Sequence, residues 1–205
     1  MKLRLSLAVA ALALAPLAAK ANLIINGGFE NPALSTGSWT VYSSILGWTT
    51  TLGSGIEIQN NVAGSPYEGR QHVELDSHNN SGMLQTVTTS PGGQYLLSFA
   101  YSPRPGVGIA SNGIDLWVDG LLLDSFTAAG GSVTSWSIRN YTITGDGATS
   151  IEFRAAGTSD SLGGYLDDVR FVVSEQGASP APEPSTLALL GLGLAGLAAS
   201  RRRKQ

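Results

Sequence analysis

Short alternating runs of apolar residues, separated by turn residues, constrain the fold of this chain most strongly. Between residues 72 and 76, for example, polar and apolar side chains alternate strictly, which places them on opposite faces of an extended strand. Clusters of Gly, Asn, Ser and Pro separate such runs, and no helical spacing occurs from residue 22 to 179. This pattern predicts about nine or ten strands in an all-β jelly-roll sandwich over residues 22–176.

Three runs give more detailed predictions. Asp119-Gly120 lies between the apolar runs 114–118 and 121–126, which predicts a tight hairpin. Residues 94–101 are apolar on both faces, as expected of a central strand. In the last run, 165–173, alternation places Asp167 on the inward face. The chain has no cysteine and therefore no disulfide bond, so any additional stabilisation must come from packing or a metal ion.

The charges are distributed unevenly along the chain. Seven of the twelve basic residues lie in the two end segments, whereas fourteen of the fifteen acidic residues lie between residues 22 and 179. That central block has five arginines, no lysine and a formal charge near −9. A basic surface for nucleic acid is therefore absent from the sequence, and an acidic surface suits solubility and divalent cations.

Residues 1–21 have the pattern of a signal peptide. Lys2 and Arg4 precede an apolar run, and Ala19-Lys20-Ala21 has the small-x-small form that signal peptidase cleaves. Cleavage there makes Asn22 the first residue of the mature protein. The alternative is a retained signal anchor.

The C-terminal end carries a second membrane-directed pattern. A linker at 177–184 ends in Pro182-Glu183-Pro184, and Leu187–Ala199 contains only Leu, Ala and Gly. As a helix, 185–200 would span roughly 24 Å at 1.5 Å per residue. We expect 185–205 to enter the membrane, with the cations that follow the apolar run on the cytoplasmic side and the domain outside. Those cations are Arg201, Arg202, Arg203 and Lys204.

This end of the chain resembles a PEP-CTERM sorting signal. The resemblance lies in the Pro-Glu-Pro motif, the short apolar span and the terminal arginine cluster, in that order. It implies processing by an exosortase, a membrane-embedded transpeptidase, in a Gram-negative bacterium that makes exopolysaccharide. The protein would be held briefly in the inner membrane and then reach the cell envelope or the extracellular space. The alternative is a tail anchor that is never cleaved.

The central block resembles the galactose-binding-like jelly rolls, which include carbohydrate-binding modules. The matching motifs are Asn26-Gly27-Gly28-Phe29-Glu30, Gly47-Trp48 and Leu166-Asp167-Asp168-Val169. The resemblance implies a structural Ca²⁺ held by Glu30 and by Asp167 or Asp168. An inward carboxylate needs such a partner, because an unpaired buried charge is costly. The alternative is that Asp167 caps backbone amides without a metal ion.

A further group of polar residues shares one strand face. His72, Glu74 and Asp76 alternate along the strand, with His78 nearby. They could form a metal or acid–base site, and Glu74 with Asp76 could act as a glycosidase pair. The alternative is a solvated strand face. The chain lacks a nucleophile elbow, a phosphate loop and a dinucleotide fingerprint, and we predict that it is not an enzyme.

Aromatic residues in the predicted loops suggest a binding surface. Trp39 and Tyr67 are the ones expected to be exposed, and the resemblance implies that such rings stack on sugars. Trp48 and Tyr101 are expected in the core. The sequence thus predicts an exported, non-catalytic β-sandwich that binds polysaccharide. The alternatives are a structural matrix protein without a glycan site and a carbohydrate-active enzyme.

Overall fold

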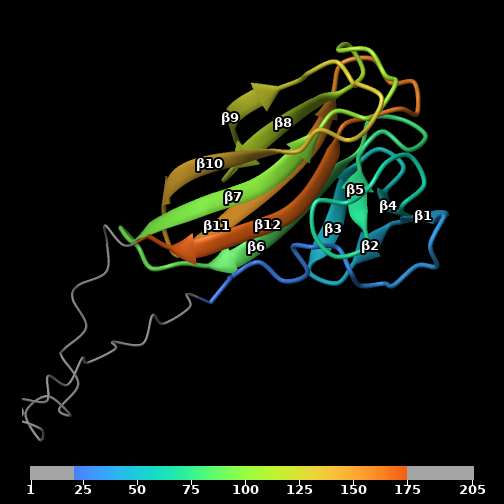
Figure 1. The fold of residues 1–205 in the computed structure, drawn as a ribbon. Helices are drawn as coiled ribbons and strands as arrows, with labels where there is room; N and C mark the ends of the chain where they lie inside the picture. Colours follow the sequence, from blue (N-terminus) through green and yellow to red (C-terminus); the bar gives the residue numbers. More distant parts are fainter. Residues whose placement is uncertain (1–20, 175–205) are drawn as a thin grey trace, which may run out of the picture.

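The computed structural model describes residues 21–174, which form two antiparallel β-sheets packed face to face (Figure 1). The first sheet has the strand order β1-β4-β5-β12-β7-β10, and the second has the order β2-β3-β6-β11-β8-β9. The strands are β1 (Ser38–Tyr42), β2 (Ser44–Ile45), β3 (Trp48–Leu52), β4 (Ile56–Asn60), β5 (His72–Glu74), β6 (Gly82–Thr88), β7 (Gln94–Ser102), β8 (Gly113–Val118), β9 (Leu121–Phe126), β10 (Ser137–Thr144), β11 (Ala148–Ala156) and β12 (Tyr165–Val173).

The path of the chain confirms the predicted jelly roll. From β5 to β8, and again from β9 to β12, successive strands alternate between the two sheets. This repeated crossing is how a jelly roll closes two antiparallel sheets around one core. No α-helix occurs within residues 21–174, in agreement with the missing helical period.

Aromatic side chains from both sheets fill the core. The ring of Trp48 lies 5.8 Å from that of Phe29 and 6.1 Å from that of Phe153. Phe99 from the first sheet meets Phe153 edge-on at 4.9 Å. Trp48 and Tyr101 are both fully buried, as predicted. Pairs of aromatic rings in these geometries add about 0.5–1.5 kcal/mol beyond the area they bury.

The predicted hairpin forms between β8 and β9. Asp119 and Gly120 both have left-handed backbone angles, with φ values of 51° and 75°. Two successive positive φ values define the type I′ turn, whose twist matches that of the flanking strands. β9 is an edge of the second sheet, and its first three residues are exposed leucines, Leu121, Leu122 and Leu123.

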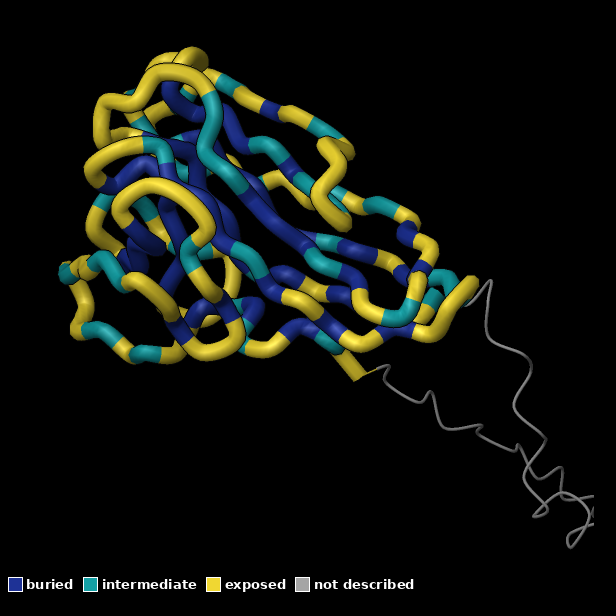
Figure 2. The backbone as a smooth tube through the Cα atoms, turned by 180° about the vertical axis from the view of Figure 1, so that it is seen from behind, coloured by how far each residue is buried: buried dark blue, intermediate teal, exposed yellow. Residues whose placement is uncertain are grey.

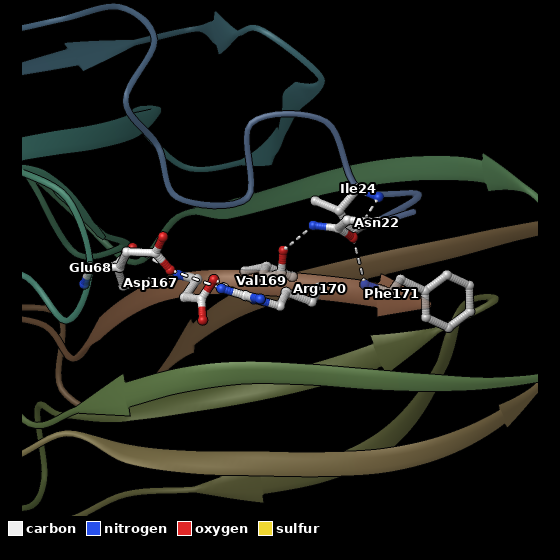
Figure 3. A network of polar contacts seen from close by, with 8 residues as sticks. Asn22, Ile24, Glu68, Asp167, Val169, Arg170 and Phe171 are labelled. Atoms are coloured by element: carbon white, nitrogen blue, oxygen red, sulfur yellow. Dashed lines mark hydrogen bonds and ion pairs between the residues drawn. The ribbon is translucent and has the colours of Figure 1, made fainter. Parts of the chain in front are cut away.

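The first residues of the domain, Asn22 and Leu23, are hydrogen-bonded to its last strand, β12. The amide of Leu23 donates to Phe171 O at 2.8 Å, and the Asn22 side chain spans Val169 O and Phe171 N (Figure 3). Gly27 also lies against β12, because a Cβ built on it would come within 2.0 Å of Val169 O. The Gly-Gly step therefore serves a close backbone approach. The left-handed residues beside it are Asn26 and Phe29.

A β-bulge interrupts β12 and corrects the predicted orientation of Asp167. The pairing of β12 with β7 shifts by one residue between Asp167 and Arg170, and Asp168 has a φ of 48°. Leu166 before the bulge and Phe171 after it both contribute to the core. Asp167 alternates with Leu166 and therefore lies on the outer face. The prediction that Asp167 faces inward was wrong, because simple alternation does not hold across a bulge.

A long loop covers this outer face. Ala63 O accepts a hydrogen bond from the Tyr165 hydroxyl at 3.0 Å, and Ser65 O accepts one from Trp136 Nε1 at 3.0 Å. Asp167 is fully buried beneath the same loop. In Figure 2, where the backbone is coloured by burial, most buried residues lie in the strands and most exposed residues lie in the loops. The outer face of the first sheet is thus partly enclosed, and polar residues beneath the loop, such as Asp167, are buried.

Candidate functional site

The candidate site begins with polar side chains on two neighbouring strands. In β4 and β5, Ile58 and Val73 pair across the strands and point into the core. Glu57, Gln59 and Glu74 therefore point to the outer face of the first sheet. Glu57 lies directly opposite Glu74, and all three side chains are buried or nearly so.

One side-chain amide joins the two carboxylates. Gln59 Nε2 donates to Glu57 Oε1 at 2.8 Å and to Glu74 Oε2 at 2.5 Å. A side-chain amide has two N–H donors, so both are used here. The orientation of the amide follows, because the reversed group would place its oxygen against two carboxylates. Within residues 21–174, Gln59 Oε1 has no hydrogen-bond partner.

Glu74 is held on every side. Its Oε2 also pairs with the Arg104 guanidinium, and its Oε1 accepts from the amide of Gly163 at 2.7 Å. Burial raises the pKa of Glu74 to about 8, against the opposing effect of Arg104. Burial also raises the pKa of Glu57, while the hydrogen bond from Gln59 and the charges of Arg104 and His78 act to lower it. Both carboxyls thus hold protons more tightly than free glutamate does.

A hollow of about 320 Å³ opens above these residues. Glu57, Gln59 and Arg104 are polar groups in its lining, and Trp39 forms a wall. Trp39 pairs with Gln59 in the register of β1 and β4, so its ring stands on the same outer face. We call this feature the Trp39 hollow; its lining is Trp39, Glu57, Gln59, Val62, Ser77, His78, Arg104 and Ser161.

The structure separates the two aromatic residues predicted to be exposed. Trp39 is 48% exposed, and its ring meets His78 edge-on at 6.3 Å. Tyr67 is 46% exposed, packs edge-on against Trp136 at 6.1 Å, and does not line the Trp39 hollow. Both are exposed as expected, but only Trp39 stands beside buried polar groups with open space between them.

The predicted group of His72, Glu74 and Asp76 is buried, so the interpretation as a solvated strand face was wrong. Asp76 accepts from Ser159 Oγ and from the Asp160 amide, which removes it from the surroundings of the Trp39 hollow. The His72 ring lies 4.3 Å from the Tyr165 ring at a tilt of 47°, and burial lowers the pKa of His72 to about 3. Neither imidazole nitrogen has a hydrogen-bond partner within the described part of the chain.

Two of the predicted metal ligands meet at a second, smaller hollow. Glu30 and Asp168 line a space of about 110 Å³ together with Glu68, Gly28 and Gly69. Glu30 Oε1 accepts from the amides of Arg70 at 2.7 Å and Gln71 at 3.0 Å. One oxygen of Glu30 is thus engaged by backbone, in the loop that approaches it. We call this space the Glu30 hollow.

Asp167, the third predicted ligand, caps backbone amides. Its Oδ2 accepts from the amides of Tyr67 at 2.8 Å and Glu68 at 3.0 Å, and its Oδ1 accepts from Asp168 at 2.7 Å (Figure 3). Burial raises the pKa of Asp167 to about 7, although these amides act to lower it. This arrangement matches the capping alternative stated from the sequence.

Arg170 neutralises the remaining acids around the Glu30 hollow. Its Nε lies 2.7 Å from Asp168 Oδ1, and its second nitrogen lies 2.9 Å from Glu68 Oε2. Within residues 21–174, no three His, Asp or Glu side chains are grouped closely enough to hold a metal ion. The calcium site therefore stays a prediction.

Sequence reasoning missed Glu57, Gln59 and Arg104. The signal was present in part, because Ile56–Gln59 alternates apolar and polar residues as a strand with one polar face does. What the pattern could not show is that the loop above the sheet would enclose this polar face. Arg104 comes from a separate loop, 45 residues beyond Gln59 in the sequence.

Several predicted features lie outside the described residues. They are residues 1–20 of the signal peptide, the linker at 177–184 with Pro182, Glu183 and Pro184, and the segment 185–205 with Arg201, Arg202 and Arg203. Within residues 21–174, no helix is long and apolar enough to span a bilayer.

Residues 180–204 match the PEP-CTERM protein-sorting motif. The match contains the Pro-Glu-Pro motif, the apolar run and the arginine cluster, and it confirms the predicted sorting signal.

The domain is similar to a small part of two much larger proteins. It is 30% identical over 152 residues to a multifunctional-autoprocessing repeats-in-toxin protein of Vibrio vulnificus, covering 72% of this chain. It is 31% identical over 156 residues to the protein of that name from Vibrio cholerae, again over 72% of this chain. The chain spans about 3% of the length of these relatives.

Among solved structures, the domain is similar to carbohydrate-binding modules and an adhesin domain. The family 61 module TmCBM61, solved with β-1,4-galactotriose, is 20% identical, with a TM-score of 0.49 over 75% of this chain and 99% of that one. A family 35 module of Clostridium thermocellum is 16% identical, with a TM-score of 0.45 over 67% and 99%.

The K1 adhesin domain of Lys-gingipain from Porphyromonas gingivalis is 15% identical, with a TM-score of 0.49 over 62% of this chain and 91% of that one. All three TM-scores are below 0.5, and this similarity does not identify a ligand for the present chain.

Proposed function

We propose that this protein is exported, sorted by an exosortase through residues 180–204, and binds a polysaccharide in the Trp39 hollow without catalysis. Signal peptidase acts first, at Ala21. The C-terminal segment then holds the chain in the inner membrane until the exosortase processes it. The domain is delivered to the envelope or the extracellular matrix, where it associates with exopolysaccharide.

The observation that carries the glycan proposal is the exposed Trp39 ring beside an enclosed polar floor. A sugar ring has C–H faces that pack on an aromatic ring and hydroxyls that both donate and accept hydrogen bonds. The floor supplies the matching groups, because Arg104 can only donate while Glu57 can accept. Ligand sites commonly combine an apolar wall with a few such polar groups, in pockets of about 300–1,000 Å³.

The state of Glu74 supports binding rather than hydrolysis. A glycosidase needs two carboxyl groups that reach the scissile bond from either side. Glu74 is fully buried, and both of its oxygens are occupied, by Gln59, Arg104 and the Gly163 amide. Glu57 alone lines the open hollow, so a second catalytic carboxyl is missing from its lining.

A structural Ca²⁺ is a further part of the proposal. Glu30, Glu68 and Asp168 surround the Glu30 hollow, and oxygen ligands of this kind suit a hard cation. Asp167 would not bind the ion itself; it positions Glu68 by accepting hydrogen bonds from the backbone amides of Tyr67 and Glu68. The bound cation would take over the role that Arg170 has here, which is to neutralise Glu68 and Asp168.

A second candidate function is a structural matrix protein that associates through β9. The three exposed leucines lie on an edge strand, and Leu121 is 74% exposed. Edge strands with apolar side chains are sites where chains pair. Copies that associate through this edge without binding any glycan would favour this second function.

The test compares two aromatic residues with nearly equal exposure. Binding of the purified protein to bacterial and plant polysaccharides, the host exopolysaccharide included, is measured by affinity electrophoresis and calorimetry. We expect Trp39→Ala to weaken binding about fivefold or more, since stacking on an aromatic ring contributes on the order of 1 kcal/mol or more. Tyr67→Ala serves as the control and should bind as the wild type does. Absence of binding to every polysaccharide, or equal binding by both variants, would overturn the proposal.

A further inference from the structure

We infer that the Trp39 hollow selects a positively charged sugar, an amino sugar with a free ammonium group, and that Glu57 is the counter-ion. The inference rests on the proposed function, because it names the class of sugar that the same hollow would take. It follows from the charges, the hydrogen-bonding capacity and the shape of the hollow.

Among the described residues, Glu57 is the carboxyl of the floor without an ion-pair partner. The Arg104 guanidinium contacts Glu74 instead. Glu57 is nearly as buried as Glu74, yet it forms no ion pair with any residue in the range 21–174. Buried carboxylates are seldom left without a partner, because their desolvation is costly. A ligand that brings a positive charge would supply that partner.

The hydrogen-bonding capacity points to the same ligand. Both protons of Gln59 Nε2 are used, and its Oε1 is a buried acceptor without a partner in the described chain. Glu57 Oε2 likewise accepts no hydrogen bond from any described residue, whereas Oε1 accepts from Gln59. On the β4 side of the floor, at Glu57 and Gln59, the unfilled capacity therefore consists of acceptors, whereas the unused donors of the floor belong to Arg104. An ammonium group has three donors and no acceptor, which makes it complementary to the Glu57 and Gln59 side chains.

The other charged groups nearby act on Glu57 without forming an ion pair with it. The charges of Arg104 and His78 both favour the ionised form of Glu57, but His78, in the loop after β5, lies edge-on against Trp39 and forms no ion pair with a described residue. Asp76 is bonded to Ser159 and Asp160, and it adds negative charge. On β12, the Tyr165 hydroxyl donates to Ala63 O. Arg104 remains the cation of the floor, and it is committed to Glu74.

The wall favours a sugar over a metal ion or a lysine side chain. A metal ion needs several ligands at once, and Glu57 is the one carboxylate among the described residues that line this hollow, which also include the cationic Arg104. A ring-shaped ligand, by contrast, would use the Trp39 face and the floor together. An ammonium held near the indole also gains from cation–π attraction.

The experiment compares two ligands that differ only in charge. Calorimetry of the full-length protein at pH 6.5 measures the affinities for a β-1,4-glucosamine tetramer and for its N-acetylated form. We expect the glucosamine tetramer to bind at least tenfold more tightly. The preference should shrink as salt increases, because it arises from charge. This comparison needs no variant and so does not depend on the folding of a mutant.

Two variants then locate the effect. Glu57→Gln keeps the shape of the side chain and an oxygen for Gln59, and we expect it to reduce the preference to about one. Asp146→Asn removes the same charge from the β10–β11 turn, and the preference should remain at least tenfold. Thermal unfolding of each variant verifies that it is folded.

The outcomes separate this inference from the proposed function. Equal, Trp39-dependent binding of both tetramers would overturn the charge selection and leave glycan binding in place. No binding of either tetramer, with Trp39-independent or absent binding to all polysaccharides, would overturn both. If EDTA abolished the preference, the positive charge at Glu57 would come from a metal ion. If a tetralysine peptide competed as well as the glucosamine tetramer for the hollow, the hollow would bind a lysine side chain and would not select a sugar. Either result would overturn the inference.

Discussion

Glu57 and Glu74 stand directly opposite each other on β4 and β5, and one amide group, that of Gln59, donates to both. Two carboxyls at such a cross-strand position would repel each other if both were ionised and unscreened. The pair is tolerated because burial favours the protonated forms of both carboxyls, and because the Arg104 guanidinium contacts Glu74 and offsets any negative charge that remains there. Because these buried groups titrate away from their ordinary pKa values, the stability of the domain should depend on pH.

The contribution of Glu74 to the stability of the domain should fall as the pH rises from about 5 to 8. The pKa of Glu74 is raised to about 8, so between its ordinary value and pH 8 the folded state binds more protons than the unfolded state. Stability then decreases with pH, by at most about 1.4 kcal/mol per pH unit for one group. Chemical denaturation at several pH values measures this slope. Glu74→Gln should flatten it, and Asp146→Asn should not. An unchanged slope in Glu74→Gln would contradict the assignment.

Replacing His72 by phenylalanine should remove a loss of stability in acid. Burial lowers the pKa of His72 to about 3, so between about pH 6.5 and 3 the unfolded state takes up a proton that the folded state excludes. His72 therefore reduces stability as the pH falls through this range. Phenylalanine keeps the contacts with Tyr165 and Trp136 and has no unpartnered nitrogen.

We expect the His72→Phe variant to be about as stable as the wild type at pH 7, or more stable by up to about 1 kcal/mol. At pH 5 it should be the more stable of the two. His72→Ala is the comparison, because it leaves a cavity and should be less stable at both pH values. A strongly destabilised phenylalanine variant would indicate that an imidazole nitrogen has a partner.

Calcium should stabilise the wild type and have little effect on Glu30→Gln. An ion that binds only the folded state, at a hundred times its dissociation constant, adds about 2.7 kcal/mol. The melting temperature with 1 mM Ca²⁺ or with EDTA measures this directly. Glu57→Gln provides the control, since Glu57 lines the other hollow and should leave the calcium effect intact. Equal melting temperatures of the wild type in Ca²⁺ and EDTA would contradict the calcium proposal.

Two adjacent glycines should respond very differently to alanine. A Cβ on Gly27 would lie 2.0 Å from Val169 O, whereas nothing lies within 4 Å of a Cβ on Gly28. Gly27→Ala must push the first residues away from β12, and we expect a loss of about 2–4 kcal/mol. Gly28→Ala should change stability by less than about 1 kcal/mol. Urea denaturation measures both, and similar losses would show that the close approach is not essential.

Changes in the sorting motif should leave the protein uncut. We expect replacement of Glu183, or of both Pro182 and Pro184, to retain the full-length chain in the inner membrane. Fractionation and immunoblotting show the size and location of the product. Replacing Glu175, an acidic residue just before the linker, is the control and should not prevent processing. Release of the Glu183 variant at its normal size would contradict the sorting role.

The sequence predicted the parts of the fold that depend on local pattern. Asp119-Gly120 gave the hairpin, because a type I′ turn needs two residues that accept positive φ. Trp48 was placed correctly in the core. Strand β5 is shorter than its alternating pattern suggested, and ends at Glu74. Hydrogen bonding to neighbours, rather than alternation, determines where a strand ends.

The candidate site depended on contacts that no local pattern encodes. Trp39 was expected to be exposed, but its polar neighbours come from β4 and from Arg104 in a distant loop. The orientation of Asp167 depended on one extra residue at Asp168, which reverses the alternation. Burial of the polar face required the 61–70 loop to fold over it. Such long-range coverage is not visible in the sequence of a single strand.

The hydrogen bonds of Asn22 and Leu23 to β12 have a consequence for when the domain can fold during export. In a chain that crosses the membrane from its N-terminus, Leu23 emerges at once, but its partner Phe171 emerges 148 residues later. The first sheet therefore cannot be completed until nearly the whole domain has crossed. Pro182 follows Phe171 by only eleven residues. Completion of the domain and arrival of the sorting motif at the membrane would thus be almost simultaneous, and an exosortase would meet a chain that has only just become able to fold.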